Sequence, residues 1–161
     1  MNKAQPQPDP EKSSGGDPHS EQAAFARQVL DAEADAIRHV EVADSFHAAV
    51  DVVLAAKDGN LVVSGLGKSG LIGQKLAATF ASTGTPAHFM HPVEAMHGDL
   101  GKVRKGDTVL LLSYGGNTEE VVSLAELLKQ DGVPVIAMVG RDDCDLAKIA
   151  AVTLLIGDVT E

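Results

Sequence analysis

Two glycine-rich segments follow apolar runs and carry the residue types that bind anions. The first, SGLGKSG, spans residues 64–70 and places Lys68 directly after the apolar run 61–63. Gly65 and Gly67 permit a tight turn from a strand into a helix, whose first N–H groups have no partner within the helix. Such a helix start binds anions, and Lys68 adds a positive charge for a phosphate or a developing oxyanion. A glycine turn with an exposed lysine explains the segment equally well.

The same segment partly matches two nucleotide-binding motifs. A P-loop needs a glycine five residues before its Gly-Lys pair, but Val62 occupies that position. A dinucleotide fold needs an acidic residue at the end of the second strand. Here that strand is followed by His91 and Pro92, and the nearest acid, Glu94, lies beyond the proline. The P-loop interpretation therefore fails, and the signal for NAD is weak.

The second segment is SYGGNTEE at residues 113–120, which again follows an apolar run. Ser113, Asn117 and Thr118 supply short polar side chains beside a predicted helix start, which suits a phosphate monoester. Asn117 and Glu120 also have the spacing of a capping box, which by itself explains both residues. Spacing alone favours the capping interpretation over catalysis.

Between these segments lies HPVEAMHGDLG at residues 91–101, which is dense in polar groups. His91, Glu94, His97 and Asp99 have the chemistry to bind a metal, but their spacing matches no standard zinc motif. Histidines that make ordinary hydrogen bonds are the favoured interpretation, so we expect no metal site.

These segments need a scaffold that brings them together. Apolar residues recur at helical spacing from residue 21 to 57, which predicts one long helix or two shorter ones with a break near residues 42–44. Short apolar runs then alternate with helical stretches; they lie at 61–64, 87–90, 108–112, 135–139 and 152–156. This pattern predicts a three-layer αβα sandwich with a five-stranded parallel sheet and ligands at the carboxyl ends of the strands. Residues 1–20 carry four of the seven prolines and predict a disordered tail.

Composition limits the partners of the protein. A formal charge of −10 disfavours nucleic acid and anionic membranes, although a small anion needs only one local cation. The single cysteine, Cys144, cannot form an intramolecular disulfide. There is no apolar run of about 18 residues and no signal-type segment near Met1, so we expect a cytoplasmic protein.

Three blocks of sequence resemble one known family. The blocks are GLGKSG at 65–70, AATFASTGTP at 77–86 and the HPVEAMHGDLG segment. They closely resemble the sugar isomerase (SIS) domain of KpsF/GutQ-type D-arabinose 5-phosphate isomerases, and the similarity extends over about residues 21–161. The resemblance implies a flavodoxin-like SIS topology with a five-stranded parallel sheet, which agrees with the pattern of apolar runs.

The resemblance also implies an activity. Family members interconvert D-arabinose 5-phosphate and D-ribulose 5-phosphate without an organic cofactor, and they supply Kdo synthesis for lipopolysaccharide or capsule. By motif position, the catalytic residues fall on Lys68, Glu120 and Glu161. The phosphate loop falls on 113–118, with Ser113, Asn117 and Thr118 as substrate-binding residues. We also assign Gly67, Ser69 and His97 to substrate binding. The resemblance thus favours catalysis by Glu120 over capping alone.

The chain departs from the family pattern in three places. The loop 113–118 usually reads S-x-S-G-E-S, and Leu71 replaces a common histidine. The family continues beyond the position of Glu161 with a further phosphate segment, a catalytic histidine and usually CBS domains, so we expect a C-terminally truncated domain. The alternatives to an isomerase are a noncatalytic sugar-phosphate sensor or partner domain and an inactive fragment. Because SIS domains commonly associate, we expect a homo-oligomer, dimer or tetramer, with residues 21–57 as a plausible interface.

Overall fold

The computed structural model describes residues 18–157 and divides the chain into two compact units, residues 1–38 and 39–161. Glu161 and residues 1–17 of the expected tail lie outside the described residues. The first unit contains α1 (Pro18–Arg38), which begins inside the segment expected to be a tail. Proline at the first helical position explains this boundary, because its fixed φ suits a helix start and its missing N–H would have no partner there.

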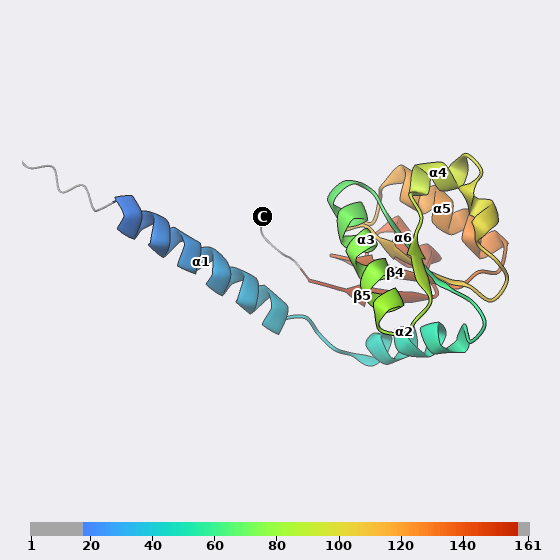
Figure 1. Ribbon diagram of the computed structural model, residues 1–161, viewed down its shortest axis with the longest axis horizontal. Coiled ribbons are helices and arrows are strands. Elements are labelled where there is room, and N and C mark those ends of the chain that lie inside the picture. The colour runs from blue at the N-terminus through green and yellow to red at the C-terminus, as the bar shows by residue number, and fades with distance from the viewer. Residues whose placement is uncertain (1–17, 158–161) are drawn as a thin grey trace, which may run out of the picture. The chain divides into compact units, whose positions relative to one another are not determined.

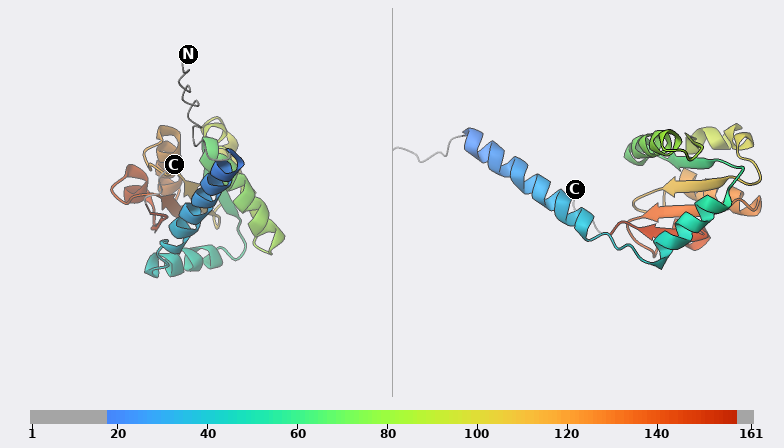
Figure 2. Two further views of the ribbon diagram at one scale, coloured as in Figure 1. Left: turned by 90° about the vertical axis from the view of Figure 1, so that its left-hand side faces the viewer. Right: turned by 60° about the horizontal axis from the view of Figure 1, so that its bottom comes forward.

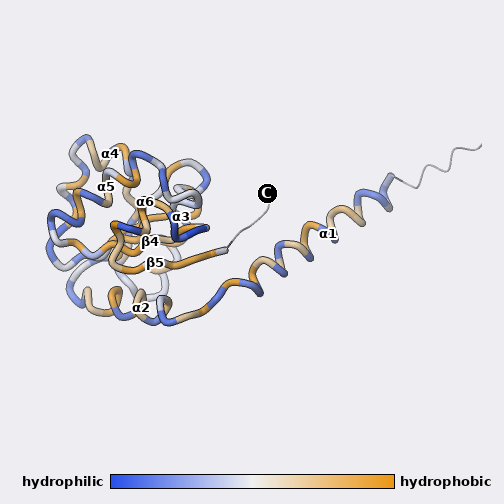
Figure 3. The backbone as a smooth tube through the Cα atoms, turned by 180° about the vertical axis from the view of Figure 1, so that it is seen from behind, coloured by the Kyte–Doolittle hydropathy of each residue, from blue (hydrophilic) through white to orange (hydrophobic). Residues whose placement is uncertain are grey.

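The helical stretch at residues 21–57 forms two helices rather than one. The second, α2 (Asp44–Ala55), follows a break at residues 39–43, close to the predicted position. Hydrophilic and apolar positions alternate along α1 (Figure 3), and none of its residues is buried; Phe25 and Ile37 are among its exposed apolar side chains. In contrast, α2 lies beside the last strand of the sheet (Figure 1) and buries Ala49.

The second unit is an αβα sandwich built on a parallel sheet. After α2, its elements are β1 (Leu61–Gly65), α3 (Gly67–Ser82), β2 (Ala87–Phe89), α4 (Pro92–Met96), the 3-10 helix η1 (Asp99–Lys102), β3 (Thr108–Leu112), α5 (Glu119–Gln130), β4 (Val135–Val139), α6 (Asp145–Ile149) and β5 (Val152–Leu155). All five strands pair in parallel in the order β2-β1-β3-β4-β5 (Figures 1 and 2). The predicted fold is therefore confirmed, and each predicted strand is found to within one residue at either end.

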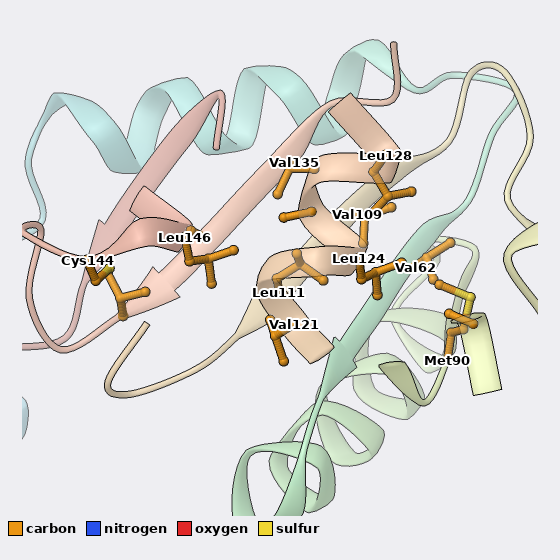
Figure 4. Packing of buried hydrophobic residues seen from close by; sticks show 14 residues of the cluster. Val62, Met90, Val109, Leu111, Val121, Leu124, Leu128, Val135, Cys144 and Leu146 are labelled. Atoms are coloured by element: carbon orange, nitrogen blue, oxygen red, sulfur yellow. The ribbon is translucent and has the colours of Figure 1, made fainter. Parts of the chain in front are cut away.

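Alternating residues of the central strands face two different helix layers. Val62, Val109 and Leu111 pack with α5 and α6 (Figure 4). Leu61, Val63 and Leu110 point to the opposite face, against α2 and α3. Because both faces are covered, the strands consist of nearly continuous apolar residues. Burial of each large aliphatic side chain contributes about 1.5–3 kcal/mol.

An apolar cavity of about 340 Å³ lies between α2, α3 and the sheet. Phe46 and Val53 of α2 and Phe80 of α3 line it, and it contains no titratable side chain. Among residues 18–157, no helix combines the length and the apolar character needed to span a bilayer.

Candidate functional site

The two glycine-rich segments meet at the carboxyl edge of the sheet. In the ladder between β1 and β3, Gly65 pairs with Leu112, so the segments after these strands leave the sheet side by side. The chain runs from β1 outward to β2 and then returns across β1 to β3. The strand order therefore reverses between β1 and β3, which is where open α/β sheets bind their ligands.

A cleft opens at this point and consists of two adjoining cavities of about 240 Å³ and 400 Å³. Lys68 and Ser69 of α3 line both of them, as do Leu112, Ser113 and Tyr114 at the end of β3. The smaller cavity also contacts Leu66, Gly115 and Thr118, and the larger one also contacts Ile72, Met138 and Ile156. We call this combined space the cleft.

The first wall of the cleft is the start of α3. The helix begins at Gly67, where φ is +58°, and Leu66 at the N-cap makes no side-chain capping hydrogen bond. A Cβ atom at Gly70 would lie 2.7 Å from the carbonyl oxygen of Gly65, so glycine lets the helix start this close to the strand. The first N–H groups of α3 and the positive end of its helix dipole thus lie beside the cleft, together with Lys68.

The second wall is the loop 113–118, whose conformation is held by internal hydrogen bonds. The Gly116 N–H donates to the Ser113 carbonyl oxygen at 3.0 Å, with φ of +67° at Gly116. The hydroxyl oxygens of Ser113 and Thr118 lie 3.1 Å apart. Short hydroxyls thus meet where the loop turns into α5, and both residues line the cleft.

The capping box suggested by the spacing of Asn117 and Glu120 is not formed. Thr118 rather than Asn117 is the N-cap of α5, and it makes no side-chain capping hydrogen bond. The Asn117 Oδ1 atom instead accepts a 2.9 Å hydrogen bond from the backbone N–H of Asp145, in α6. This capping prediction is wrong because α5 begins one residue later than the capping box requires, and the Asn117 oxygen faces α6 instead.

The cleft gathers four of the predicted site residues: Lys68, Ser69, Ser113 and Thr118. Gly67, His97 and Asn117 are exposed, and Glu120 is half-buried in the first turn of α5. None of these four is among the residues that line the cleft. Glu161 lies outside the described residues.

His97 follows α4, where its backbone N–H donates to the Glu94 carbonyl oxygen at 3.1 Å. Within residues 18–157, no three side chains of His, Cys, Asp or Glu come together in a group that could hold a metal ion.

Sequence reasoning missed the apolar wall of the cleft. Ile72 lies four residues after Lys68 on α3, and helical spacing could have placed both on one face. Met138 pairs with Leu112 across the β3–β4 ladder, which only the strand order reveals. Tyr114 lies within the predicted phosphate loop, so its position was available from the sequence.

Comparison with known proteins agrees with this geometry. The SIS domain family matches residues 53–160 of the chain. The chain belongs to the SIS domain family. It is 47% identical over 131 residues to arabinose 5-phosphate isomerase KdsD of Pseudomonas aeruginosa, covering 80% of this chain and 40% of the relative. Arabinose 5-phosphate isomerase GutQ of Escherichia coli O6:H1 is 42% identical over 130 residues, with the same shares of the two chains. This SIS domain thus spans about 40% of the length of these curated relatives.

Solved structures resemble this SIS domain over most of its length. One is a putative phosphosugar isomerase involved in capsule formation from Bacteroides fragilis, with 38% identity and a TM-score of 0.84. The match covers 87% of this chain and 76% of the other. The second is a protein of E. coli CFT073 in complex with arabinose 5-phosphate, with 35% identity, a TM-score of 0.83 and coverage of 88% and 76%.

Proposed function

We propose that this SIS domain binds a sugar phosphate in the cleft and takes part in the interconversion of D-arabinose 5-phosphate and D-ribulose 5-phosphate. The observation that carries the proposal is the cleft between β1 and β3, where Lys68 stands beside two helix starts. The named activity of the relatives and the arabinose 5-phosphate complex of a structural neighbour support the choice of sugar.

The chemistry of the substrate fits the two walls. A phosphate monoester accepts hydrogen bonds on its outer oxygens, which suits the hydroxyls of Ser113 and Thr118 and the backbone N–H groups that begin α5. Lys68 faces the cleft from the opposite wall. There it is placed to neutralise negative charge on the phosphate or on a sugar oxygen.

Isomerisation of an aldose to a ketose moves one hydrogen between adjacent carbons. After the ring opens, a base removes the proton at C2, and the electron pair forms a C1–C2 double bond while the aldehyde oxygen becomes negative. Delivery of a proton to C1, transfer of the O2 proton to the base, and protonation of O1 complete the ketose. The step needs no external oxidant, because C1 is reduced as C2 is oxidised.

We assign three residues to these steps. Lys68 stabilises the enediolate oxygen, while Glu120 and Glu161 are the candidate carboxylates for proton transfer. Glu120 is in the first turn of α5, two residues after the phosphate loop ends at Thr118. In the isomerase family that this sequence resembles, neighbouring subunits help to close the site. We therefore propose that the active form is a homo-oligomer.

One observation favours a second function. Among the described residues, no carboxylate lines the cleft, although it holds a cation and short hydroxyls. The described lining of the cleft thus carries the groups that bind a sugar phosphate, but within residues 18–157 it contains no carboxylate to act as the base. The alternative is therefore a noncatalytic sugar-phosphate sensor or partner domain.

Turnover distinguishes these functions. The purified chain is incubated with D-arabinose 5-phosphate while D-ribulose 5-phosphate is measured, and binding is followed by thermal shift. Turnover supports the isomerase, whereas a thermal shift without turnover supports the sensor. The absence of both a thermal shift and turnover would contradict both functions.

The base is tested with a matched pair of variants on α5. Glu120→Gln should lower turnover by about 10²–10⁴-fold if Glu120 transfers the proton. Glu119→Gln makes the same chemical change at the neighbouring exposed position and should keep wild-type turnover. Equal turnover in Glu120→Gln and the wild type would show that another residue is the base.

A further inference from the structure

The loop 113–118 is attached to α6, a helix that contributes no residue to the lining of the cleft. Two hydrogen bonds join them: the Asp145 N–H donates to Asn117 Oδ1 at 2.9 Å, and the Leu146 N–H donates to the Gly116 carbonyl oxygen at 3.0 Å. These donors are the first two N–H groups of α6, which have no partner within the helix. The loop therefore supplies the cap that Cys144, at the N-cap of α6, does not provide.

The anchor for these bonds is fixed in the core. Cys144 and Leu146 are 1% and 0% exposed and lie in the cluster that also contains residues of α5 and β4 (Figure 4). Gly116 packs directly on this anchor, because a Cβ atom at Gly116 would lie 2.1 Å from the Cys144 Sγ atom. The loop, whose residues Tyr114, Gly115 and Asn117 are exposed, is thus tied to one of the most buried parts of the fold.

The hydrogen bond also fixes which way the Asn117 side chain points. A backbone N–H can donate only to an acceptor, so the carbonyl oxygen of the Asn117 amide must face α6 and its NH₂ group must point away. Consistent with this, Asn117 does not line the cleft, whereas its neighbour Thr118 does. The observed hydrogen bond of the Asn117 side chain is therefore with α6 and not with a group of the cleft.

We propose that Asn117 is a positioning residue that clamps the phosphate loop to the first turn of α6 and so holds the hydroxyls of Ser113 and Thr118 in place for the ligand. This proposal rests on the proposed function, because it assumes that the loop receives the phosphate. It assigns Asn117 a role that differs from that of a direct phosphate ligand.

Two variants separate these roles in the ligand-free protein. Asn117→Ala removes the acceptor, so hydrogen exchange at the Asp145 amide should become roughly 3- to 10-fold faster, the value of one lost hydrogen bond. Amides of the loop should exchange faster as well. Asn117→Asp keeps an acceptor oxygen and should restore wild-type exchange, while Glu119→Ala, an exposed neighbour outside the clamp, should leave it unchanged.

Affinity for D-arabinose 5-phosphate, measured by calorimetry under conditions where every variant is folded, completes the test. We expect Asn117→Ala to bind roughly 3- to 10-fold more weakly than the wild type. Unchanged exchange with weaker binding would show that Asn117 is only a ligand. Faster exchange with unchanged affinity would show that the clamp does not position the loop. Either result overturns the proposal.

Failure of the proposed function gives a different result. If the wild-type chain binds no D-arabinose 5-phosphate, the assigned ligand is wrong. The hydrogen-exchange rates of the Asp145 and loop amides then test the clamp without any ligand. Wild-type exchange rates in Asn117→Ala would overturn it.

Discussion

Gly116 is the residue at which one methyl group should disturb the phosphate loop most. Its φ of +67° lies in the left-handed region, and its backbone packs against Cys144. In Gly116→Ala, the new Cβ atom would meet the Cys144 Sγ atom at 2.1 Å and the Cys144 Cβ atom at 2.6 Å. Cys144 is 1% exposed, so the sulfur has little room to move.

The cost of Gly116→Ala has three parts. Left-handed backbone costs an alanine about 1–2 kcal/mol. Overpacking of a buried site costs about 1–3 kcal/mol. Restriction of the unfolded chain returns about 0.4–1 kcal/mol. We therefore expect the free energy of unfolding to fall by roughly 1–5 kcal/mol, with weaker binding of D-arabinose 5-phosphate.

Urea denaturation followed by circular dichroism measures this change. The control is Gly115→Ala in the same loop, where no atom lies within 4 Å of the added Cβ position and φ is outside the left-handed region. This variant should be neutral or slightly stabilising. Adding Cys144→Ala to Gly116→Ala removes the closest contact and should recover part of the loss. Equal stability of Gly115→Ala and Gly116→Ala would refute the reasoning.

Two further predictions concern groups away from the cleft. Asp107 is 2% exposed and its carboxylate accepts the backbone N–H groups of Asn60 and Arg104, each at 2.7 Å. Asp107→Ala should lower the free energy of unfolding by about 1.5–3 kcal/mol for each bond lost, and Asp107→Asn by less, as urea denaturation will show. The hydrogen bond and charge of Asp145 raise the pKa of Lys148, so Asp145→Ala should lower that pKa in an NMR titration. Because the pKa is raised by folding, the small stabilisation from this exposed pair is present below the ordinary lysine pKa and is lost as the pH rises through the raised value. An unchanged Lys148 pKa in Asp145→Ala would contradict this assignment.

The strands could be predicted because their signal is local. Val62, Val109 and Leu111 lie in short, continuous apolar runs, and a parallel sheet covered on both faces requires such runs. The alternation of these runs with helical stretches then fixed the fold class, and the wall formed by Lys68 followed from the strand–glycine–helix order.

Contacts between distant segments could not be predicted. Spacing alone predicts that Asn117 caps α5, because Glu120 follows it at capping-box spacing, and the family resemblance places Asn117 in the phosphate loop. Its partner, the Asp145 N–H, is 28 residues further along the chain, and only the packing of α6 brings it near. Met138 enters the cleft for the same reason, because strand order places it beside Leu112.

Binding of D-arabinose 5-phosphate to Lys68 variants tests the central claim most directly. Calorimetry should detect binding of D-arabinose 5-phosphate but not of unphosphorylated D-arabinose. Lys68→Met should weaken binding roughly 10- to 100-fold, the value of a charge-assisted hydrogen bond. Lys75→Met, which removes the same charge from an exposed position of α3 that does not line the cleft, should bind as the wild type does. Equal affinities of Lys68→Met and Lys75→Met would contradict a sugar-phosphate site in this cleft.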